Sequence, residues 1–324
     1  MSPTPHALLA SLLWLTLLAS CSLDLTPRPS GQLTVMTWNV ENLFDDVDDG
    51  TEYPEFDPQK GWSRADFWQR CESLAKVIRT ATGQSSPDLL VLEEVESPRA
   101  LEVLNSRFLG DLGYRFTFIT PPESQGMRTA FLSRYPLLNT GVHWPETPAE
   151  GSLRPILEVE LDLGGRHLVV LANHWKSRIP TPGATEGQRA VSGQLLGRRL
   201  GELQNREDHP LVLAVGDFNT SVDLSRPWPQ PSMKGSFERT LIGGVELTDP
   251  WPQAGEPRGS YFYHGDWNAL DHMFVLASSL LAGDWAAENF HPVRFAPQPL
   301  PWGPRTRNGV SDHFPLLLTL VRRA

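Results

Sequence analysis

Cysteine is nearly absent from this chain of 324 residues, since Cys21 and Cys71 are the only two. Structural zinc sites need paired Cys or His ligands, and neither Cys pairs nor a two-His helical signature occurs among the nine histidines. The Gly-x-x-x-x-Gly-Lys-Ser/Thr loop that cradles nucleotide triphosphates is also missing. These absences argue against zinc sites and against nucleotide triphosphate chemistry.

Positive charge is scarce as well, because 28 Lys and Arg face 38 Asp and Glu and leave a net charge of −10. A protein that coats nucleic acid nonspecifically neutralises many phosphates with clustered bases, so that class is disfavoured. A local basic patch would still suffice to hold one substrate. The predicted loops supply candidates for it: Arg128, Lys176, Arg178, Arg305 and Arg307.

No apolar run reaches the roughly 20 residues of a membrane-spanning helix. Residues 7–18 instead have the length of a signal-peptide core, although no Lys or Arg precedes them. Residues 18–21, Leu-Ala-Ser-Cys, resemble a bacterial lipobox, which implies removal of residues 1–20 and a lipid on Cys21. With Pro27 and Pro29, residues 21–31 are expected to form a short stiff tether. This interpretation places the protein in the cell envelope, on the periplasmic or outer side of a bacterial membrane, or secreted.

Residues 32–324 are long enough for one large domain, and 40% apolar residues allow a sizeable core. Spacing predicts helices over 64–80, 98–112 and 186–203, with Cys71 buried in the first. Strand 157–163 alternates Glu158 and Glu160 with apolar residues, so it is expected to be half exposed, and Gly164-Gly165 to turn it into a hairpin. Trp228 and Trp251 are expected to pack in loops. The acidic run 45–52 lacks EF-hand spacing, so a solvated loop is expected.

Residues 211–215 are apolar at every position, which predicts a central strand buried on both faces. Gly216-Asp217-Phe218-Asn219 follows at its end and offers a carboxylate and an amide. Acids, amides or imidazoles stand at the ends of other predicted strands too. The six junctions are Thr37-Trp38-Asn39, Leu92-Glu93-Glu94, Asn173-His174, 216–219, Leu270-Asp271-His272 and Ser311-Asp312-His313.

This ordered set resembles the endonuclease/exonuclease/phosphatase superfamily of deoxyribonuclease I, over about residues 32–322. The resemblance implies an α/β fold, a four-layered α/β sandwich of two packed mixed β-sheets flanked by helices, with the site at one end of the sheets. It also implies a metal-dependent phosphodiesterase that uses magnesium, with manganese as an alternative.

The resemblance assigns roles to individual positions. It implies Glu94 as the main metal ligand, completed by Asn39, Asp312 and Glu41. Asp217 would orient or deprotonate the attacking water, and Asn219 would bind a non-bridging oxygen. The remaining implied roles are His313 at the phosphate or as base, Asp271 fixing its ring, His174 donating to phosphate or leaving oxygen, Lys176 and Arg178 contacting phosphate, and Glu93, where many relatives carry Gln, lying behind the ligands.

The phrase Asn-His-Trp-Lys-Ser at 173–177 is similar to that of secreted bacterial nucleases of the superfamily, which favours nucleic acid, DNA or RNA, as substrate. A sphingomyelinase-like or other phosphoester hydrolase is the alternative for a membrane-tethered protein. A surface lipoprotein that binds without catalysis is a third, although the intact acid and histidine set counts against it. We expect a monomer that touches the membrane through lipidated Cys21 and needs no protein partner.

Overall fold

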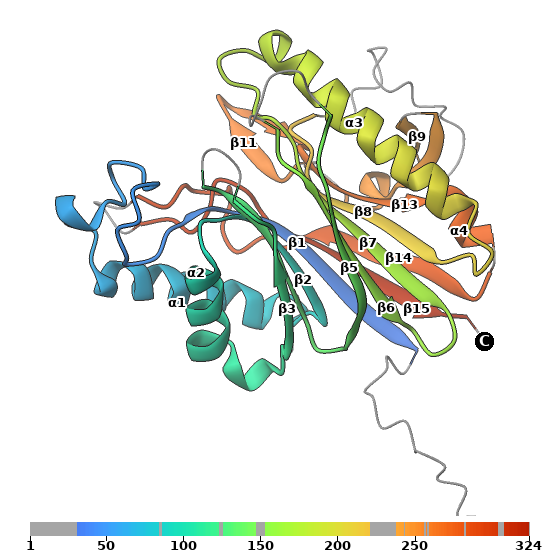
Figure 1. Cartoon of the computed structure of the whole chain (residues 1–324), viewed down its shortest axis with the longest axis horizontal. Coiled ribbons are helices and arrows are strands. Elements are labelled where there is room, and N and C mark those ends of the chain that lie inside the picture. The colour runs from blue at the N-terminus through green and yellow to red at the C-terminus, as the bar shows by residue number, and fades with distance from the viewer. Residues whose placement is uncertain are drawn as a thin grey trace, which may run out of the picture.

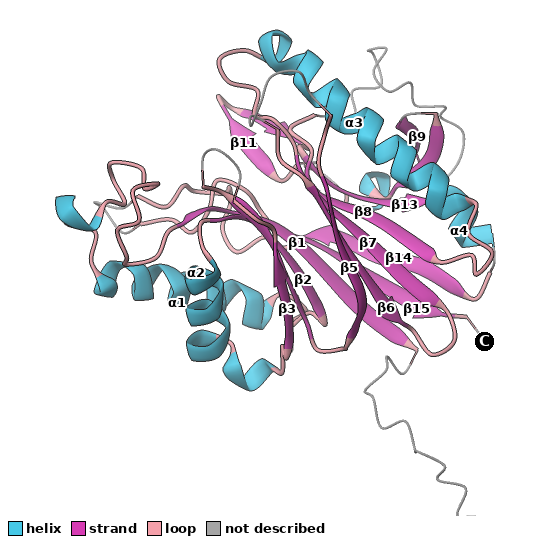
Figure 2. Ribbon diagram, viewed as in Figure 1, coloured by secondary structure: helices cyan, strands magenta, loops and turns pink. Residues whose placement is uncertain are grey.

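Two β-sheets lie face to face, with α1 and α2 against one sheet and α3 against the other (Figures 1 and 2). This computed structural model describes residues 31–83, 86–122, 126–146, 153–220, 238–242, 244–255, 257, 259–281, 283–303 and 308–323. The arrangement confirms the predicted four-layered α/β sandwich. The expected leader, tether and lipidated Cys21 lie outside the described residues, as do Trp228, Arg305 and Arg307.

The first sheet has the strand order β14-β15-β1-β2-β4-β3. Its central strands β1 and β2 run parallel, and β15 and β4 flank them antiparallel. The strands are β1 (Gln32–Leu43), β2 (Leu89–Val95), β3 (Phe116–Ile119), β4 (Arg128–Ser133), β14 (Trp285–Pro292) and β15 (Leu316–Arg322).

The second sheet has the order β5-β6-β7-β8-β13-β10-β9, with β7 and β8 parallel at its centre. A separate hairpin pairs β11 with β12. The strands are β5 (Leu137–His143), β6 (Ile156–Asp162), β7 (His167–His174), β8 (Leu211–Asp217), β9 (Glu238–Ile242), β10 (Val245–Asp249), β11 (Tyr261–Tyr263), β12 (Asp266–Asn268) and β13 (Asp271–Leu276). Strands β5, β9, β10, β11, β12 and β14 are additions that the sequence patterns had not indicated.

The three longer helices, α1, α2 and α3, begin at side-chain caps. Ser63 and Asp66 form a capping box at α1, and Ser97 and Thr181 cap α2 and α3. Residues 98–112 were expected to form one helix, but the α-helical part ends early and continues as a π turn and a 3₁₀ turn. The helices are α1 (Arg64–Thr80), α2 (Pro98–Val103), α3 (Pro182–Gln204) and α4 (Ala277–Leu281), with short turns at Pro58–Lys60, Leu104–Phe108, Gly110–Leu112 and Trp251–Gln253.

The central strand β8 explains why its sequence is apolar throughout. Leu211, Leu213 and Val215 point into the core between the sheets, whereas Val212 and Ala214 pack under α3. All five side chains are fully buried, as predicted. The apolar sides of the strand fix its position, so its polar end is held at one edge of the sandwich.

The prediction that strand 157–163 is half exposed was wrong. Glu158 and Glu160 are only 4% and 7% exposed, because arginines cover them. Arg199 of α3 donates two hydrogen bonds to Glu158, at 2.6 and 2.7 Å, and Arg206 donates to Glu160 at 2.6 Å. Alternation of polar and apolar residues marked the correct faces but could not reveal that the polar face is covered.

Other packing predictions had mixed outcomes. Trp251 is buried and packs edge-on against Phe290, and Cys71 is fully buried, both as expected. The acidic loop is solvated only in part, because Asp45 is buried and accepts a hydrogen bond from Ser97 Oγ at 2.6 Å. Over the described ranges, helices are too short or too polar to traverse a bilayer.

Candidate active site at one edge of the two sheets

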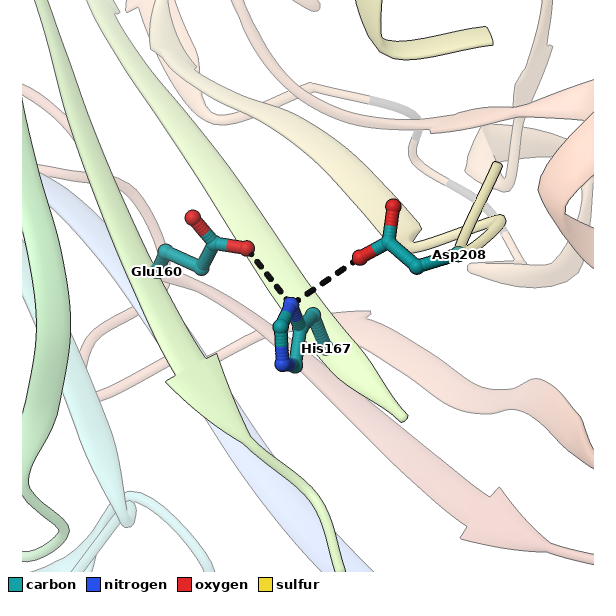
Figure 3. A group of neighbouring side chains, drawn as sticks. All are labelled: Glu160, His167 and Asp208. Carbon is teal, nitrogen blue, oxygen red and sulfur yellow. Dashed lines mark ion pairs between the residues drawn. The ribbon is translucent and has the colours of Figure 1, made fainter. Parts of the chain in front are cut away.

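Within the described residues, two groups of side chains have ligand atoms close enough to surround a cation. Each group consists of two carboxylates and one histidine. The first, Glu160, His167 and Asp208, lies at the start of β7 (Figure 3), with His167 Nδ1 2.8 Å from Glu160 and 3.0 Å from Asp208. Arg206 donates to both of these carboxylates at 2.6 Å. Because a guanidinium already neutralises it, this group is an ion-pair cluster of the outer surface.

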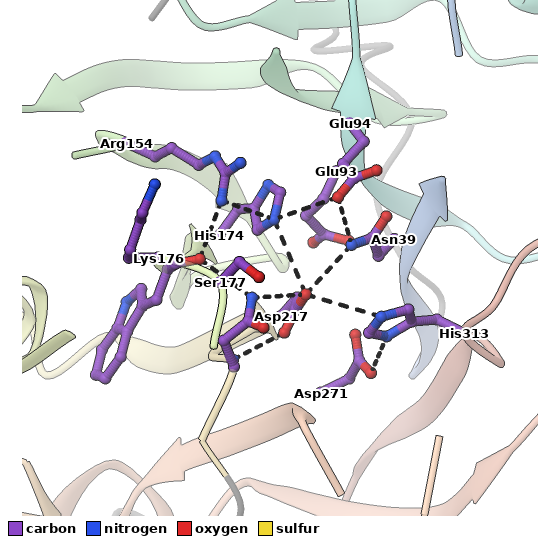
Figure 4. A network of polar contacts seen from close by, with 12 residues as sticks. Asn39, Glu93, Glu94, Arg154, His174, Lys176, Ser177, Asp217, Asp271 and His313 are labelled. Carbon is purple, nitrogen blue, oxygen red and sulfur yellow. Dashed lines mark hydrogen bonds and ion pairs between the residues drawn. The ribbon is translucent and has the colours of Figure 1, made fainter. Parts of the chain in front are cut away.

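The second group, Asp217, Asp271 and His313, is buried at the opposite end of the strands, where the predicted junctions meet (Figure 4). Gly216 makes that meeting possible. Its φ of +124° lies in the region that favours glycine, and a Cβ there would stand 1.9 Å from the carbonyl oxygen of Asn173. Any other residue would push β8 away from β7 just before Asp217.

Asp217 is the centre of the site. Its Oδ2 accepts from Asn39 Nδ2 at 3.2 Å and from Asn219 Nδ2 at 3.0 Å, while Oδ1 accepts from the Asn219 backbone at 2.8 Å. The same Oδ2 lies 3.9 Å from His174 Nε2 and 4.0 Å from His313 Nε2. Burial, then the charge of Asp271, raises the pKa of Asp217 to about 7. A carboxylate with that pKa is suited to exchange a proton near neutral pH.

His313 and Asp271 form a pair at one side of this centre. His313 Nδ1 lies 2.7 Å from Asp271 Oδ2, and Ser260 Oγ donates to the same carboxylate. Burial opposes a charge on the ring, but Asp271 and Asp312 raise the pKa of His313 well above its usual value. The ring therefore presents a proton on Nε2 toward Asp217.

Glu94, Asn39 and Glu41 stand on the other side, on β1 and β2. Asn39 Nδ2 donates to Glu94 Oε1 at 3.1 Å, the Asn42 backbone donates to Glu94 Oε2 at 3.0 Å, and the Trp302 backbone donates to Glu41 at 2.7 Å. Burial, then Asp312, raises the pKa of Glu41 to about 8. Burial also raises the pKa of Asp312, with Glu94 adding to the rise.

These oxygens fit a divalent cation. Magnesium and manganese prefer carboxylate and amide oxygens, and magnesium needs only one or two carboxylates besides water. In the part of the chain described, neither Lys nor Arg forms an ion pair with Glu41, Glu94 or Asp312. Burial is the main cause of the raised pKa values of Glu41 and Asp312, and neighbouring carboxylates add to it, so a bound cation would stabilise the charged forms.

Backbone bulges aim these ligands. The β1–β2 register shifts between Asn39 and Leu43, and Glu41 and Glu94 have φ of +52° and +64°. Non-glycine residues rarely take such values, which cluster at functional sites. Arg70, fully buried in α1, donates to the carbonyl oxygens of Val40 and Glu41. Its guanidinium thus stabilises the bulge from below.

His174 and Arg154 close the site at β7. Arg154 Nη1 lies 3.0 Å from His174 Nε2 and 3.0 Å from the carbonyl oxygen of Trp175. A guanidinium only donates, so His174 Nε2 is the acceptor. Burial, then Arg154, lowers the pKa of His174 well below its usual value. The family resemblance implied that His174 donates to the phosphate or the leaving oxygen, and the structure places the Arg154 guanidinium directly beside that nitrogen.

The predicted basic contacts lie at the rim. Lys176 stands on the Arg154 side, away from His313 (Figure 4), and Arg178 donates to Asn268 Oδ1 at 3.3 Å. Arg128 Nε donates to the carbonyl oxygen of Glu96 at 2.9 Å, so this N–H group is already used within the protein. The site therefore has cations on the β7 side and carboxylates on the β1–β2 side.

Some residues of the site gave no sequence signal. Arg154 precedes a strand and belongs to no motif, and Arg70 lies on a helix where a surface base would be expected. Tyr261 belongs to a hairpin that was not predicted, and its ring centroid lies 4.8 Å from that of His313. Glu93, expected behind the ligands, is fully buried and accepts from Thr37 Oγ1 at 2.8 Å. Burial, then Asp271, raises its pKa well above the usual value.

Several solved structures share the fold of this chain. Solved structures with this fold include D. rerio TDP2, in a humanized form and with a single-strand DNA product, at TM-scores of 0.60 and 0.58 and 18% identity over 89% of this chain and 98% of that chain. A Bacteroides thetaiotaomicron endonuclease/exonuclease/phosphatase family protein gives 0.55 at 17% identity, over 90% of this chain and 98% of its own. The human Nocturnin catalytic domain, with bound sulfate, gives 0.56 at 15% identity, over 92% and 96%.

These identities are low enough that the likeness concerns the fold alone. A search of curated protein sequences found no match. A sequence model of the Endonuclease/Exonuclease/phosphatase family, in contrast, matches residues 34–322, nearly the whole described domain. The matched range includes every strand that contributes to the site. The chain therefore belongs to the endonuclease/exonuclease/phosphatase family.

Proposed function

We propose that this protein is a metal-dependent phosphodiesterase that hydrolyses nucleic acid, with magnesium or manganese held by Glu94, Asn39, Asp312 and Glu41. The observation that carries the proposal is the convergence on Asp217 described above. A carboxylate with a pKa of about 7 lies 4.0 Å from His313, whose pKa is raised well above its usual value, and Glu94 and Asp312 nearby form no ion pair with Lys or Arg among the described residues. Membership in the family is consistent with this chemistry.

The roles of the side chains follow from their protonation. A divalent cation bound at Glu94 would supply positive charge to the phosphate oxygens as they become more negative. Asp217 orients a water and takes its proton, since its carboxylate accepts hydrogen bonds and its pKa is close to neutral. The Nε2 proton of His313 would donate to a non-bridging oxygen. The amide of Asn219 donates to Asp217 Oδ2 and to the Trp175 carbonyl oxygen, so Asn219 would bind a non-bridging oxygen by exchanging the Trp175 partner for it.

Arg154 would contact the phosphate from the side opposite His313. The Arg154 guanidinium reaches the site beside His174. Its hydrogen bond to Nε2 orients the His174 imidazole, and its charge, together with burial, favours the neutral form of that ring. Arg154, with Lys176 and Arg178 at the rim, would bind the phosphate and its neighbour in the strand. Asp271 holds the His313 ring in place through Nδ1.

A nucleic acid is preferred over a membrane lipid because the phrase Asn-His-Trp-Lys-Ser at 173–177 is similar to that of secreted bacterial nucleases. The neighbour D. rerio TDP2, crystallised with single-strand DNA, supports the same choice.

The test is a substrate panel. Plasmid DNA, single-stranded DNA, RNA, sphingomyelin vesicles and phosphoinositides would be incubated with magnesium, manganese or EDTA. We expect cleavage of nucleic acid with metal and none with EDTA. Glu94→Gln should be inactive at limiting metal, whereas Glu246→Gln, at the half-buried start of β10, should match the wild type. Metal-independent cleavage, or exclusive cleavage of sphingomyelin, would refute the proposal.

The anchor has its own test. Intact-mass analysis of protein purified from membranes should give a mature chain that begins at Cys21 with added lipid. A Cys21→Ser variant should then be found in the soluble fraction with its activity intact. A mature chain without added lipid would remove the anchor and leave the catalytic proposal untouched.

A further inference from the structure

The hairpin of β11 and β12 belongs to neither large sheet and projects from the α3 side of the sandwich (Figure 1). Its base is joined to the catalytic pair: Tyr261 forms a β-bridge with His313, and the Phe314 backbone donates to the Ser260 carbonyl at 2.7 Å. Its tip is His264-Gly265, both with positive φ. The hairpin thus leads from the catalytic histidine outward to solvent.

The two faces of this hairpin differ. On one face Phe262 and Trp267 pack together at 5.1 Å, and Trp267 stacks on Phe314 with Arg294 4.6 Å from its ring. That face is used to hold the hairpin on the domain. Its attachment leaves the alternate residues, on the opposite face, available for other contacts.

The opposite face carries a row of aromatic rings. The Tyr261 ring lies 4.8 Å from that of His313, and Tyr263 follows at 6.1 Å with an interplanar angle of 19°. Tyr263 is 57% exposed, one of the most exposed large hydrophobic side chains among the described residues. Tyr263 also packs against its neighbour His264, at 4.1 Å, yet these contacts within the hairpin leave more than half of its surface exposed.

The charged residues around Tyr261 and Tyr263 indicate which part of a substrate lies against the two rings. Asn268, opposite Tyr261 in the hairpin, accepts from Arg178, which brings a cation beside the inner ring. Asp266, opposite Tyr263, places a carboxylate at the tip. Phosphate is therefore favoured near Arg178 and disfavoured at the tip, so the tip contacts the flat uncharged part of the substrate.

We propose that Tyr261 and Tyr263 form a base-stacking subsite for single-stranded nucleic acid, next to the phosphate that is cut. Each base has a π face that stacks on tyrosine without sequence preference. In a duplex both faces of a base are covered by its neighbours, so only a single strand or a frayed end can use the subsite. This inference rests on the proposed nuclease function and adds strand preference to it.

The experiment compares Tyr263→Ser with Tyr263→Phe, which keeps the ring. The substrate is a labelled oligothymidylate of roughly 12 nucleotides, a length within known single-strand site sizes. It is offered as a single strand, as a duplex, and as a strand with abasic residues on both sides of the scissile phosphate. Leu138→Ser is the matched control, because Leu138 is 54% exposed at the far end of β5.

For the single strand, Tyr263→Ser should lower kcat/KM by about 5- to 150-fold, the range for loss of one base stack. Tyr263→Phe and Leu138→Ser should match the wild type. The abasic strand should be cut slowly by wild type and equally by Tyr263→Ser. Fluorescence anisotropy in EDTA should show the same loss of binding to the single strand only.

An equal loss on abasic and normal strands, no loss on either, or a wild type that prefers the duplex would overturn the subsite. Absence of strand binding by the wild type in EDTA would do so as well. Metal-dependent cleavage of the abasic strand by every variant would leave the nuclease function standing while the subsite fails. If no strand is cut under any condition, the nuclease function fails, and the anisotropy of Tyr263→Ser still decides whether the rings bind bases.

Discussion

The two ends of the second sheet carry groups of similar composition and opposite electrostatics. At the outer group, Arg206 pairs with Glu160 and Asp208, and further along the same strand Arg199 pairs with Glu158. Although burial opposes it, hydrogen bonds from His143 and Arg199 lower the pKa of Glu158 to about 2. At the catalytic end, burial raises the pKa of Asp217 to about 7 and that of Glu41 to about 8.

The difference shows what makes an acidic cluster functional. A carboxylate paired with arginine has its charge compensated and stabilises the fold. A buried carboxylate without such a partner is stabilised by binding a proton or a cation. Figure 3 draws the carboxylates and the histidine of the outer group, and Figure 4 draws the network at the catalytic end. Composition alone would rank the clusters equally, so the arginines decide.

The largest expected effect comes from Asp217→Asn, which removes the central charge and keeps the shape. Turnover should fall about 10²–10⁴-fold, as for loss of a general base. Folding should not suffer, because a folded pKa raised to about 7 means that ionisation of Asp217 lowers the stability of the native state, and a neutral Asn removes that cost. Single-turnover rates and thermal unfolding measure both.

Asp208→Asn is the matched change in the outer cluster, and it should leave turnover unchanged. Binding of an uncleavable strand should persist in Asp217→Asn. An unchanged rate in Asp217→Asn would mean that Asp217 is only a turn residue at the end of β8.

Arg70→Met should have the next largest effect. Arg70 is fully buried and donates to the Val40 and Glu41 carbonyls, and hydrogen bonds from a charged donor are worth about 1.5–3 kcal/mol each. We expect the free energy of unfolding to fall by roughly 3 kcal/mol or more. The magnesium concentration for half-saturation should rise because the bulge that aims Glu41 relaxes.

Urea unfolding and calorimetric metal titration give these two quantities. Arg189→Met is the control: Arg189 is equally buried in α3 and donates to the carbonyl oxygen of Pro182 at 2.6 Å. Its loss should cost stability without changing metal affinity. Equal metal affinity in Arg70→Met and wild type would argue against a positioning role for Arg70.

Magnesium should stabilise the protein more at high pH. The folded pKa values of Glu41 and Asp217 are raised, so the folded state keeps protons longer than the unfolded state, and stability falls as pH rises from about 4 to about 8. A cation relieves this loss. At roughly 100 times its Kd, magnesium should add about 2.7 kcal/mol.

Thermal unfolding with magnesium and with EDTA, at about pH 8 and about pH 5, tests this dependence. Glu94→Gln should lose most of the shift at both pH values. If wild type and Glu94→Gln gained equally, magnesium would be acting elsewhere on the protein.

Glu158→Gln should give the smallest effect, and only on stability. The folded pKa of Glu158 is lowered to about 2, so its contribution is present above about 4.5 and is lost as pH falls through about 2. Unfolding at neutral pH should cost about 2 kcal/mol less, as for a charged hydrogen-bond pair. Acid titration of stability would check this, and a loss of nuclease turnover at neutral pH would contradict the separation of the two clusters.

The sequence alone was sufficient for the features that depend on local pattern. The capped helix α1 appeared with both of its predicted ends, and the apolar run of β8 predicted burial on both faces. The junctions were also found, because residues at the ends of parallel strands such as β7 and β8 must lie at one edge. Period and punctuation along the chain carry that information.

Tertiary structure decided which of these residues have partners. Asn39 meets Asp217 across 178 residues, and the Trp302 backbone reaches Glu41 across 261. No local pattern could reveal that Arg199 covers Glu158, that Arg70 supports a bulge, or that Tyr261 lies against His313. Local periodicity determines which face of a strand or helix a side chain occupies, whereas its charge, burial and pKa depend on groups brought together only when the two sheets pack.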